Sequence, residues 1–135
     1  MKQNNYEPMN KQAVQQWIRV GPNKALIDDA ERFGTELKKG KLSTTQIRHV
    51  FTKLKGIEAK GYKSKKVEFL MLKPLMAYAA SRQKVKGLKM IKDRVSWGID
   101  EVLSAKSDEA GEERFKNFCR FFEAILAYHK AAGGK

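Results

Sequence analysis

The sequence contains few of the residues from which disulfides, metal sites and catalytic centres are built. Its single cysteine, Cys119, excludes an intramolecular disulfide and is typical of a reducing, cytoplasmic location. The two histidines, His49 and His129, together with one cysteine do not amount to a zinc ligand set. Glycine-rich phosphate-binding patterns are missing as well. We therefore expect no catalytic residue, no metal and no other cofactor.

Long apolar segments are also missing. No uncharged stretch approaches the roughly 20 apolar residues that a membrane-spanning helix needs. Residues 1–17 lack the apolar run of a secretory signal. With 41% hydrophobic and 32% charged residues among 135, the composition suits one soluble globular domain without a membrane partner.

Positive charge, in contrast, is abundant and concentrated in one block. Residues 38–94 hold 17 Lys and Arg but only three acidic residues, a net charge of +14. The other 78 residues hold 11 basic and 12 acidic residues, so the block accounts for the whole formal charge of +13. Charge of one sign at this density repels itself and attracts a polyanion. The block therefore predicts a nucleic-acid partner.

Apolar residues recur with helical spacing along the chain, and no segment alternates as a strand does. Asn23 is expected to cap a helix over 24–39 that Gly40 ends as its C′ residue, and Ser43 and Gln46 predict a capping box at the next helix. A third helix, over 64–81, has a wide apolar face that predicts a central position, and Pro74 predicts a kink or break near residues 70–74.

Two further helices, over 84–105 and from 107 to about 130, complete the prediction of an all-α fold, a compact bundle of about five helices. Residues 1–21 are polar and are expected to form an arm or a short helix before a single helical-bundle domain over 22–132. Gly56 and Gly61 bracket an expected basic connection. The segment between the second and third helices, Lys55 to Lys63, is longer than the three- to four-residue turn of a helix-turn-helix motif.

Seven basic side chains on the second helix and around the junction of the third and fourth are the candidate RNA contacts. We expect them to form one stripe: Arg48, Lys53, Lys55, Arg82, Lys84, Lys86 and Lys89. Such a stripe binds phosphates without reading bases, and its affinity falls with salt. Most aromatic rings occupy apolar stripes, which leaves Tyr62 and Trp97 as rings expected to be exposed for base stacking.

Two alternatives stay open at this point. A small ribonuclease could use His49 and His129 as acid and base, although His129 falls on the apolar stripe of the last helix, seven residues after Phe122. The chain could also be a free-standing RNA-binding helical protein that does not recognise sequence.

Three stretches of the sequence, in this order and spacing, resemble one protein family. They run from Leu42 to Arg48 (LSTTQIR), from Leu72 to Arg82 (LKPLMAYAASR) and from Phe121 to Lys130 (FFEAILAYHK). Together they are similar to the small subunit of type III-A CRISPR effector complexes, the Csm complexes, over about residues 26–130.

This resemblance implies an all-helical, non-catalytic protein that is present in several copies per complex. The copies would stack along backbone subunits that hold the guide crRNA, near the large subunit, and line the groove where target RNA pairs with the guide. Arg48 and Arg82 match basic positions of the family motifs, so the resemblance implies that both contact RNA. The acidic residues at 28–36 and 100–113 are candidates for contact with neighbouring copies.

Overall fold

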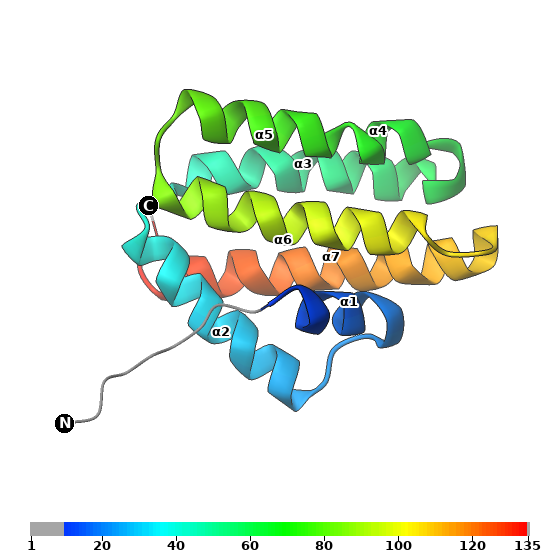
Figure 1. Cartoon of the computed structure of the whole chain (residues 1–135), viewed down its shortest axis with the longest axis horizontal. Coiled ribbons are helices and arrows are strands. Elements are labelled where there is room, and N and C mark those ends of the chain that lie inside the picture. The colour runs from blue at the N-terminus through cyan, green and yellow to red at the C-terminus, as the bar shows by residue number, and fades with distance from the viewer. Residues whose placement is uncertain (1–9, 135) are drawn as a thin grey trace.

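The computed structural model describes residues 10–134. All regular secondary structure in this range is helical (Figure 1). The helices are α1 (Lys11–Val20), α2 (Lys24–Lys39), α3 (Thr44–Lys60), α4 (Lys66–Leu70), α5 (Leu72–Arg82), α6 (Lys86–Leu103) and α7 (Asp108–Ala131), with a 3-10 turn, η1 (Tyr62–Ser64), before α4. The predicted all-α class is confirmed. Within the described range, no helix is both long and apolar enough to cross a membrane.

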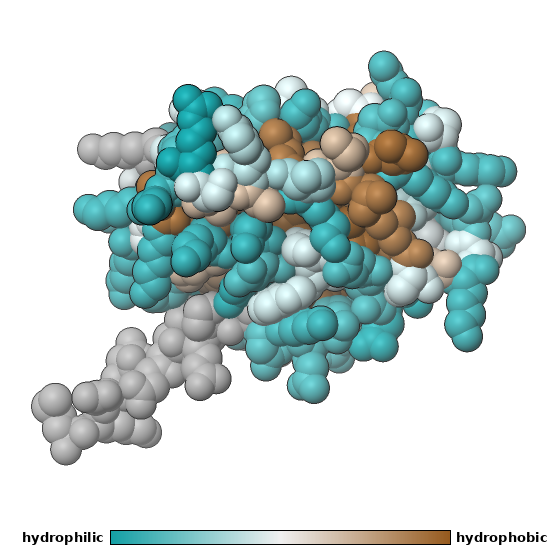
Figure 2. All heavy atoms as spheres, turned by 45° about the horizontal axis from the view of Figure 1, so that its top comes forward, coloured by the Kyte–Doolittle hydropathy of each residue, from teal (hydrophilic) through white to brown (hydrophobic). Residues whose placement is uncertain are grey.

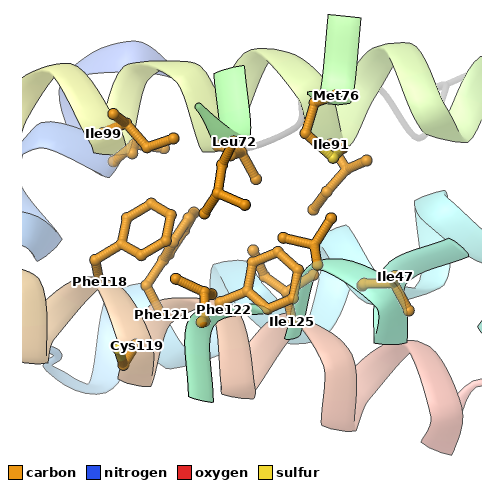
Figure 3. Close-up of a cluster of buried hydrophobic side chains, with 14 of the residues drawn as sticks. Ile47, Leu72, Met76, Ile91, Ile99, Phe118, Cys119, Phe121, Phe122 and Ile125 are labelled. Atoms are coloured by element: carbon orange, nitrogen blue, oxygen red, sulfur yellow. The ribbon is translucent and has the colours of Figure 1, made fainter. Parts of the chain in front are cut away.

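The helices form three layers (Figure 1). The antiparallel helices α6 and α7 run through the middle, α3 and the α4–α5 segment cover one side, and α1 and α2 cover the other. Side chains of α3, α5, α6 and α7 point toward one another between the layers, as Ile47, Leu72, Ile91 and Phe118 do in Figure 3. The apolar stripes of the sequence therefore converge on one core.

Helix caps form where the sequence predicts them. The side chain of Asn23 accepts a hydrogen bond from the Leu26 N–H at 3.0 Å, and Ser43 and Gln46 form both bonds of a capping box. The prediction for Gly40 needs correction: its φ is −80°, and Lys41 is the residue in the left-handed region. Gly40 instead permits a close approach, because a Cβ there would lie 2.8 Å from the Gly87 nitrogen.

The predicted third helix breaks at Met71, between α4 and α5, as the position of Pro74 suggested. Its predicted central position is wrong. Phe69, Leu72 and Met76 are buried, but Val67 and Met71 are largely exposed. Phe69, Leu72 and Met76 form one inward stripe at steps of three and four residues, and the rest of the wide apolar face remains on the surface. The central helices are α6 and α7.

Residues 11–20 form α1, which is anchored in the core. Val14, Trp17 and Ile18 are buried, the Trp17 indole donates to the Asn117 carbonyl oxygen at 3.1 Å, and the Asn117 amide donates to the Ile18 carbonyl oxygen at 2.9 Å. The expected arm over residues 1–9 lies outside the described residues. With α1 added and the third helix divided, the expected number of about five helices is only approximate.

Helix α3 continues through Gly56 to Lys60, so the connection to α4 is shorter than expected. In place of a basic loop between Gly56 and Gly61, the chain makes a full extra turn of helix with Ile57 in the core. Burial of Ile57 compensates for the poor helix propensity of Gly56.

Candidate nucleic-acid interface

One end of the bundle gathers helix termini from distant parts of the sequence (Figure 1). The Gly87 N–H at the start of α6 donates to the Gly40 carbonyl oxygen at 2.8 Å, and the side chains of Gln46 and Gln83 are hydrogen-bonded. The starts of α3 and α6 therefore lie beside the ends of α2 and α5.

The last turn of α7 joins the same end of the bundle through His129. Its imidazole is fully buried, and Nε2 lies 2.7 Å from the Leu42 carbonyl oxygen. Because a carbonyl can only accept a hydrogen bond, Nε2 carries the proton and donates. This bond fastens α7 to the connection between α2 and α3.

We call this region the basic end and define it by seven exposed cations, on α2, α3, α5, α6 and the connections between them, that have no acidic partner in residues 10–134. They are Lys38, Lys41, Arg48, Arg82, Lys84, Lys86 and Lys89. Uncompensated charges of one sign, held on the ends of packed helices, produce a field that attracts an extended polyanion.

A trough between α5 and α6 begins at this end. An open hollow of 660 Å³ has Ala77, Ala80 and Ser81 on the α5 side, and its other side is lysine. A neighbouring hollow of 300 Å³ shares Ala77 and Lys92 with it and extends to Lys73 and Trp97. We call the two together the α5–α6 trough, whose cations are Lys73, Lys84, Lys86, Lys89 and Lys92.

The start of α6 adds to the positive potential of the trough. Its N-cap residue, Val85, makes no side-chain hydrogen bond to the helix, and its first turn holds no acidic residue. The positive end of the helix dipole is therefore left uncompensated next to Lys86, which lines the trough.

The structure brings some of the seven predicted contacts together and separates others. Lys84, Lys86 and Lys89 share the trough, and Arg48 and Arg82 lie exposed on the same basic end. The other two lie away from it. Lys53 lines a different groove, between α3 and the α4–α5 segment.

Lys55 lies on another face of α3, where acidic side chains surround it. Its ammonium is 3.1 Å from Glu58 and 3.5 Å from Glu123 on α7. The hydrogen bond to Glu58 and then the charge of Glu123 raise the pKa of Lys55. The expected single stripe is therefore divided, and Lys55 is the predicted contact that is least available to a phosphate.

Lys73 and Lys92 are trough residues that sequence reasoning missed. Lys92 follows Lys89 by three positions, so the helical period alone could have placed both on one face of α6. Lys73 could not have been found in this way, because its side chain reaches the trough from α5 and pairs with Asp100 on α6.

The two rings expected to be exposed behave differently. The prediction for Tyr62 is wrong: only 3% of its surface is exposed, and its ring stacks on Phe115 at 5.2 Å. Trp97 is half-buried, with the Arg94 guanidinium 5.1 Å from its ring, and it lines the outer part of the trough. Tyr78, which lies in the segment expected to form the third helix, is 62% exposed.

The histidine pair of the ribonuclease alternative finds no support in this geometry. His129 is sealed in the core, whereas His49 is exposed on α3. A ring without solvent access cannot reach a substrate phosphate, so His129 has a structural role. Residues 10–134 also contain no group of three or more His, Cys, Asp or Glu side chains placed to hold a metal ion.

The comparisons with known proteins give one match. No curated protein and no solved structure matches the chain at a significant level. The family model described as Csm2 Type III-A matches residues 21–135, which is most of the chain. The chain therefore belongs to the Csm2 family, the small subunits of type III-A CRISPR complexes.

Proposed function

We propose that this Csm2 family chain holds the ribose-phosphate backbone of RNA against its basic end and the α5–α6 trough. In the complex, this RNA is the target strand paired with the guide crRNA, and the chain acts there as a non-catalytic, cytoplasmic subunit. The proposal depends on one observation: the seven exposed cations of the basic end have no acidic partner among residues 10–134.

The chemistry of the trough suits RNA whose sequence is set by a guide. The alanines on its α5 side leave room for riboses, and the lysines can follow the phosphates as mobile point charges. The guanidinium groups of Arg48 and Arg82 can each donate two hydrogen bonds to one phosphate, which would fix the position of the strand. None of these contacts distinguishes one base from another, so any guide–target pair fits.

We also infer that copies of the chain stack along the backbone subunits, next to the large subunit. Glu112 and Glu113, at the start of α7, lie near the end of the bundle opposite the basic end, and they would meet basic residues of a neighbouring copy. Head-to-tail contacts of this kind extend into open arrays. If the double variant Glu112→Lys, Glu113→Lys still co-purified with the complex in full copy number, this contact would be excluded.

RNA binding is tested by fluorescence anisotropy with purified full-length protein and labelled single-stranded and duplex RNA. The triple variant Lys84→Gln, Lys86→Gln, Lys89→Gln should bind both RNAs about 100-fold more weakly at low salt, since three phosphate contacts are removed. The slope of log affinity against log salt should become shallower by about two for single-stranded RNA.

A matched control removes the same charge from another part of the surface. The triple variant Lys60→Gln, Lys63→Gln, Lys66→Gln takes away three lysines near the opposite end, two of which are paired with Asp108. It should bind RNA within about threefold of wild type. Equal losses in the two triple variants would show that net charge, rather than the trough, determines affinity, and would contradict the proposal.

A further inference from the structure

A second groove lies on the outer layer, between α3 and the α4–α5 segment. α3 packs mainly on α7, and α5 packs mainly on α6, so the seam between the two outer helices is left open. The resulting hollow has a volume of 620 Å³ and runs along α3 from Lys53 to Lys60 and along the other wall from Lys65 to Tyr78. We call it the α3–α5 groove.

The walls of this groove carry most of the exposed apolar surface of the described chain. Val67 is 67% exposed, Met71 57% and Tyr78 62%, and all three line the groove. Leu70, at 44%, lies between Val67 and Met71 in sequence. Figure 2 brings this side of the bundle forward and shows apolar atoms gathered in one patch among hydrophilic side chains. Contiguous apolar surface of this kind marks an interaction site.

Gly56 keeps the α3 side of the groove free of side-chain bulk. It lies inside a helix, where glycine is unfavourable, and a Cβ at this position would meet nothing within 4 Å. Neither a positive φ nor a close packing contact within the chain accounts for a glycine here. The missing side chain leaves room for another chain to approach the backbone of α3 closely.

The rim of the groove is positively charged. Lys53, Lys60 and Lys65 line it together with a single acidic residue, Glu68, and no ion pair in residues 10–134 involves these three lysines. We propose that the α3–α5 groove binds an amphipathic helix of another protein, with its apolar face against Met71 and Tyr78 and acidic side chains along its flanks. This proposal does not rest on the RNA-binding role.

Two other occupants fit the groove less well. Apart from Val20 and Leu70, the large apolar residues exposed in the described chain line the groove, so a second copy would have to meet it groove to groove, with two lysine rims facing each other. RNA would have to place its phosphates and riboses against the exposed apolar side chains of Val67 and Met71, and Tyr78 is the single ring in the lining on which a base could stack. Apolar walls with a cationic rim match an acidic amphipathic helix instead.

The test uses the full-length protein and a fluorescein-labelled helical peptide of about 18 residues, roughly five turns, with leucine along one face and glutamate on both flanks. A matched peptide carries lysine in place of every glutamate. The acidic peptide should bind at least about tenfold more tightly than the basic one, because only its flanks complement the rim.

Variants of the protein locate the bound peptide. Gly56→Leu adds a side chain to the groove at a position where a Cβ meets no atom within 4 Å, and it should weaken binding of the acidic peptide by about tenfold or more. Met71→Gln should weaken it severalfold. Val20→Gln is the matched control, since Val20 is 70% exposed but outside the groove lining. It should leave peptide affinity unchanged, and circular dichroism should show that all three variants are folded.

Each other outcome overturns the proposal. Equal affinity for the two peptides, no binding, or unchanged binding by Gly56→Leu would exclude an acidic helix in this groove. A concentration-dependent dimer in sedimentation that Gly56→Leu dissociates would assign the groove to a second copy. Loss of RNA affinity in Gly56→Leu would assign it to nucleic acid, whereas unchanged RNA affinity keeps this proposal separate from the RNA-binding role.

Discussion

The two ends of the bundle are both rich in lysine, yet they differ in how that charge is compensated. At the basic end, Lys84, Lys86 and Lys89 face solvent without an acidic partner in the described chain. Near the opposite end, Lys66 lies 2.7 Å and Lys63 lies 3.8 Å from Asp108. The number of basic residues is therefore a poor guide to where an anion binds. Whether each of them is paired with an acidic residue is a better one.

The difference arises from which helix termini meet. The start of α7 supplies Asp108 beside η1, so Lys63 and Lys66 are neutralised within the fold. At the end of α2, Glu36 pairs with Lys39, but the end of α5 and the start of α6 supply no acidic residue, so the seven cations of the basic end keep their charge. The basic end therefore keeps an uncompensated field that a polyanion can offset.

The largest expected effect comes from giving the basic end the acidic residues that the opposite end already has. The double variant Lys86→Glu, Lys89→Glu should bind RNA at least about 100-fold more weakly at low salt, because attraction in the trough becomes repulsion. Anisotropy titrations measure this. The control Lys63→Glu, Lys66→Glu has the same change in net charge and should lose much less affinity.

The next effect concerns the support beneath the basic end. His129→Leu should lower the free energy of unfolding by about 2 kcal/mol, because the buried Leu42 carbonyl loses its donor. Chemical denaturation measures the loss. Hydrogen exchange should accelerate at the end of α2 and the start of α3 before it does near η1.

Two variants serve as controls for this prediction. His129→Gln keeps a side-chain donor and should recover part of the stability, whereas His49→Leu changes an exposed residue and should have little effect. A His129→Leu protein as stable as wild type would show that the bond to Leu42 does not fasten the helices.

Local features of this fold could be read from the sequence, because neighbouring residues determine them. The caps at Asn23 and Ser43 and the break next to Pro74 are short-range effects, and all were predicted correctly. The exposed apolar surface of α4–α5 was not predicted correctly. Which stripe of the wide apolar face turns inward depends on how α5 packs against α6, and the sequence pattern alone is compatible with either stripe.

The candidate site shows the same division. The sequence reveals the charge of the block, but several of the acids that neutralise part of it come from outside the block. Asp108 is 42 positions from Lys66, and Asp100 is 27 positions from Lys73. Pairing across such separations depends on which helices pack together, so the division between paired and unpaired lysines required the structure.

A smaller effect is expected from the two arginines that the family resemblance selects. Arg48→Ala and Arg82→Ala should each weaken RNA binding by about fivefold at low salt and leave helicity unchanged, because both side chains are exposed at helix ends. Anisotropy and circular dichroism measure the two quantities. Unchanged affinity would remove that arginine from the interface and restrict RNA contact to the trough.

The smallest effect is expected from removing the acidic partner of the two paired lysines at the opposite end. Asp108→Asn frees Lys63 and Lys66, yet RNA affinity should rise by less than about twofold, because two free lysines remote from the trough add only a weak long-range field. A larger rise, approaching the loss seen on charge reversal in the trough, would mean that RNA contacts both ends.

The same variant should also change how stability depends on pH. The hydrogen bond from Lys66 lowers the pKa of Asp108 in the folded protein. A carboxyl group with a lowered folded pKa stabilises the fold above its ordinary pKa of about 3.9 and loses this contribution as the pH falls through the folded value. Melting temperatures should therefore fall more steeply in wild type than in Asp108→Asn on acidification below about pH 4. Parallel curves would mean that the ion pair does not stabilise the fold, and that Asp108 serves only to cancel the field of its lysines.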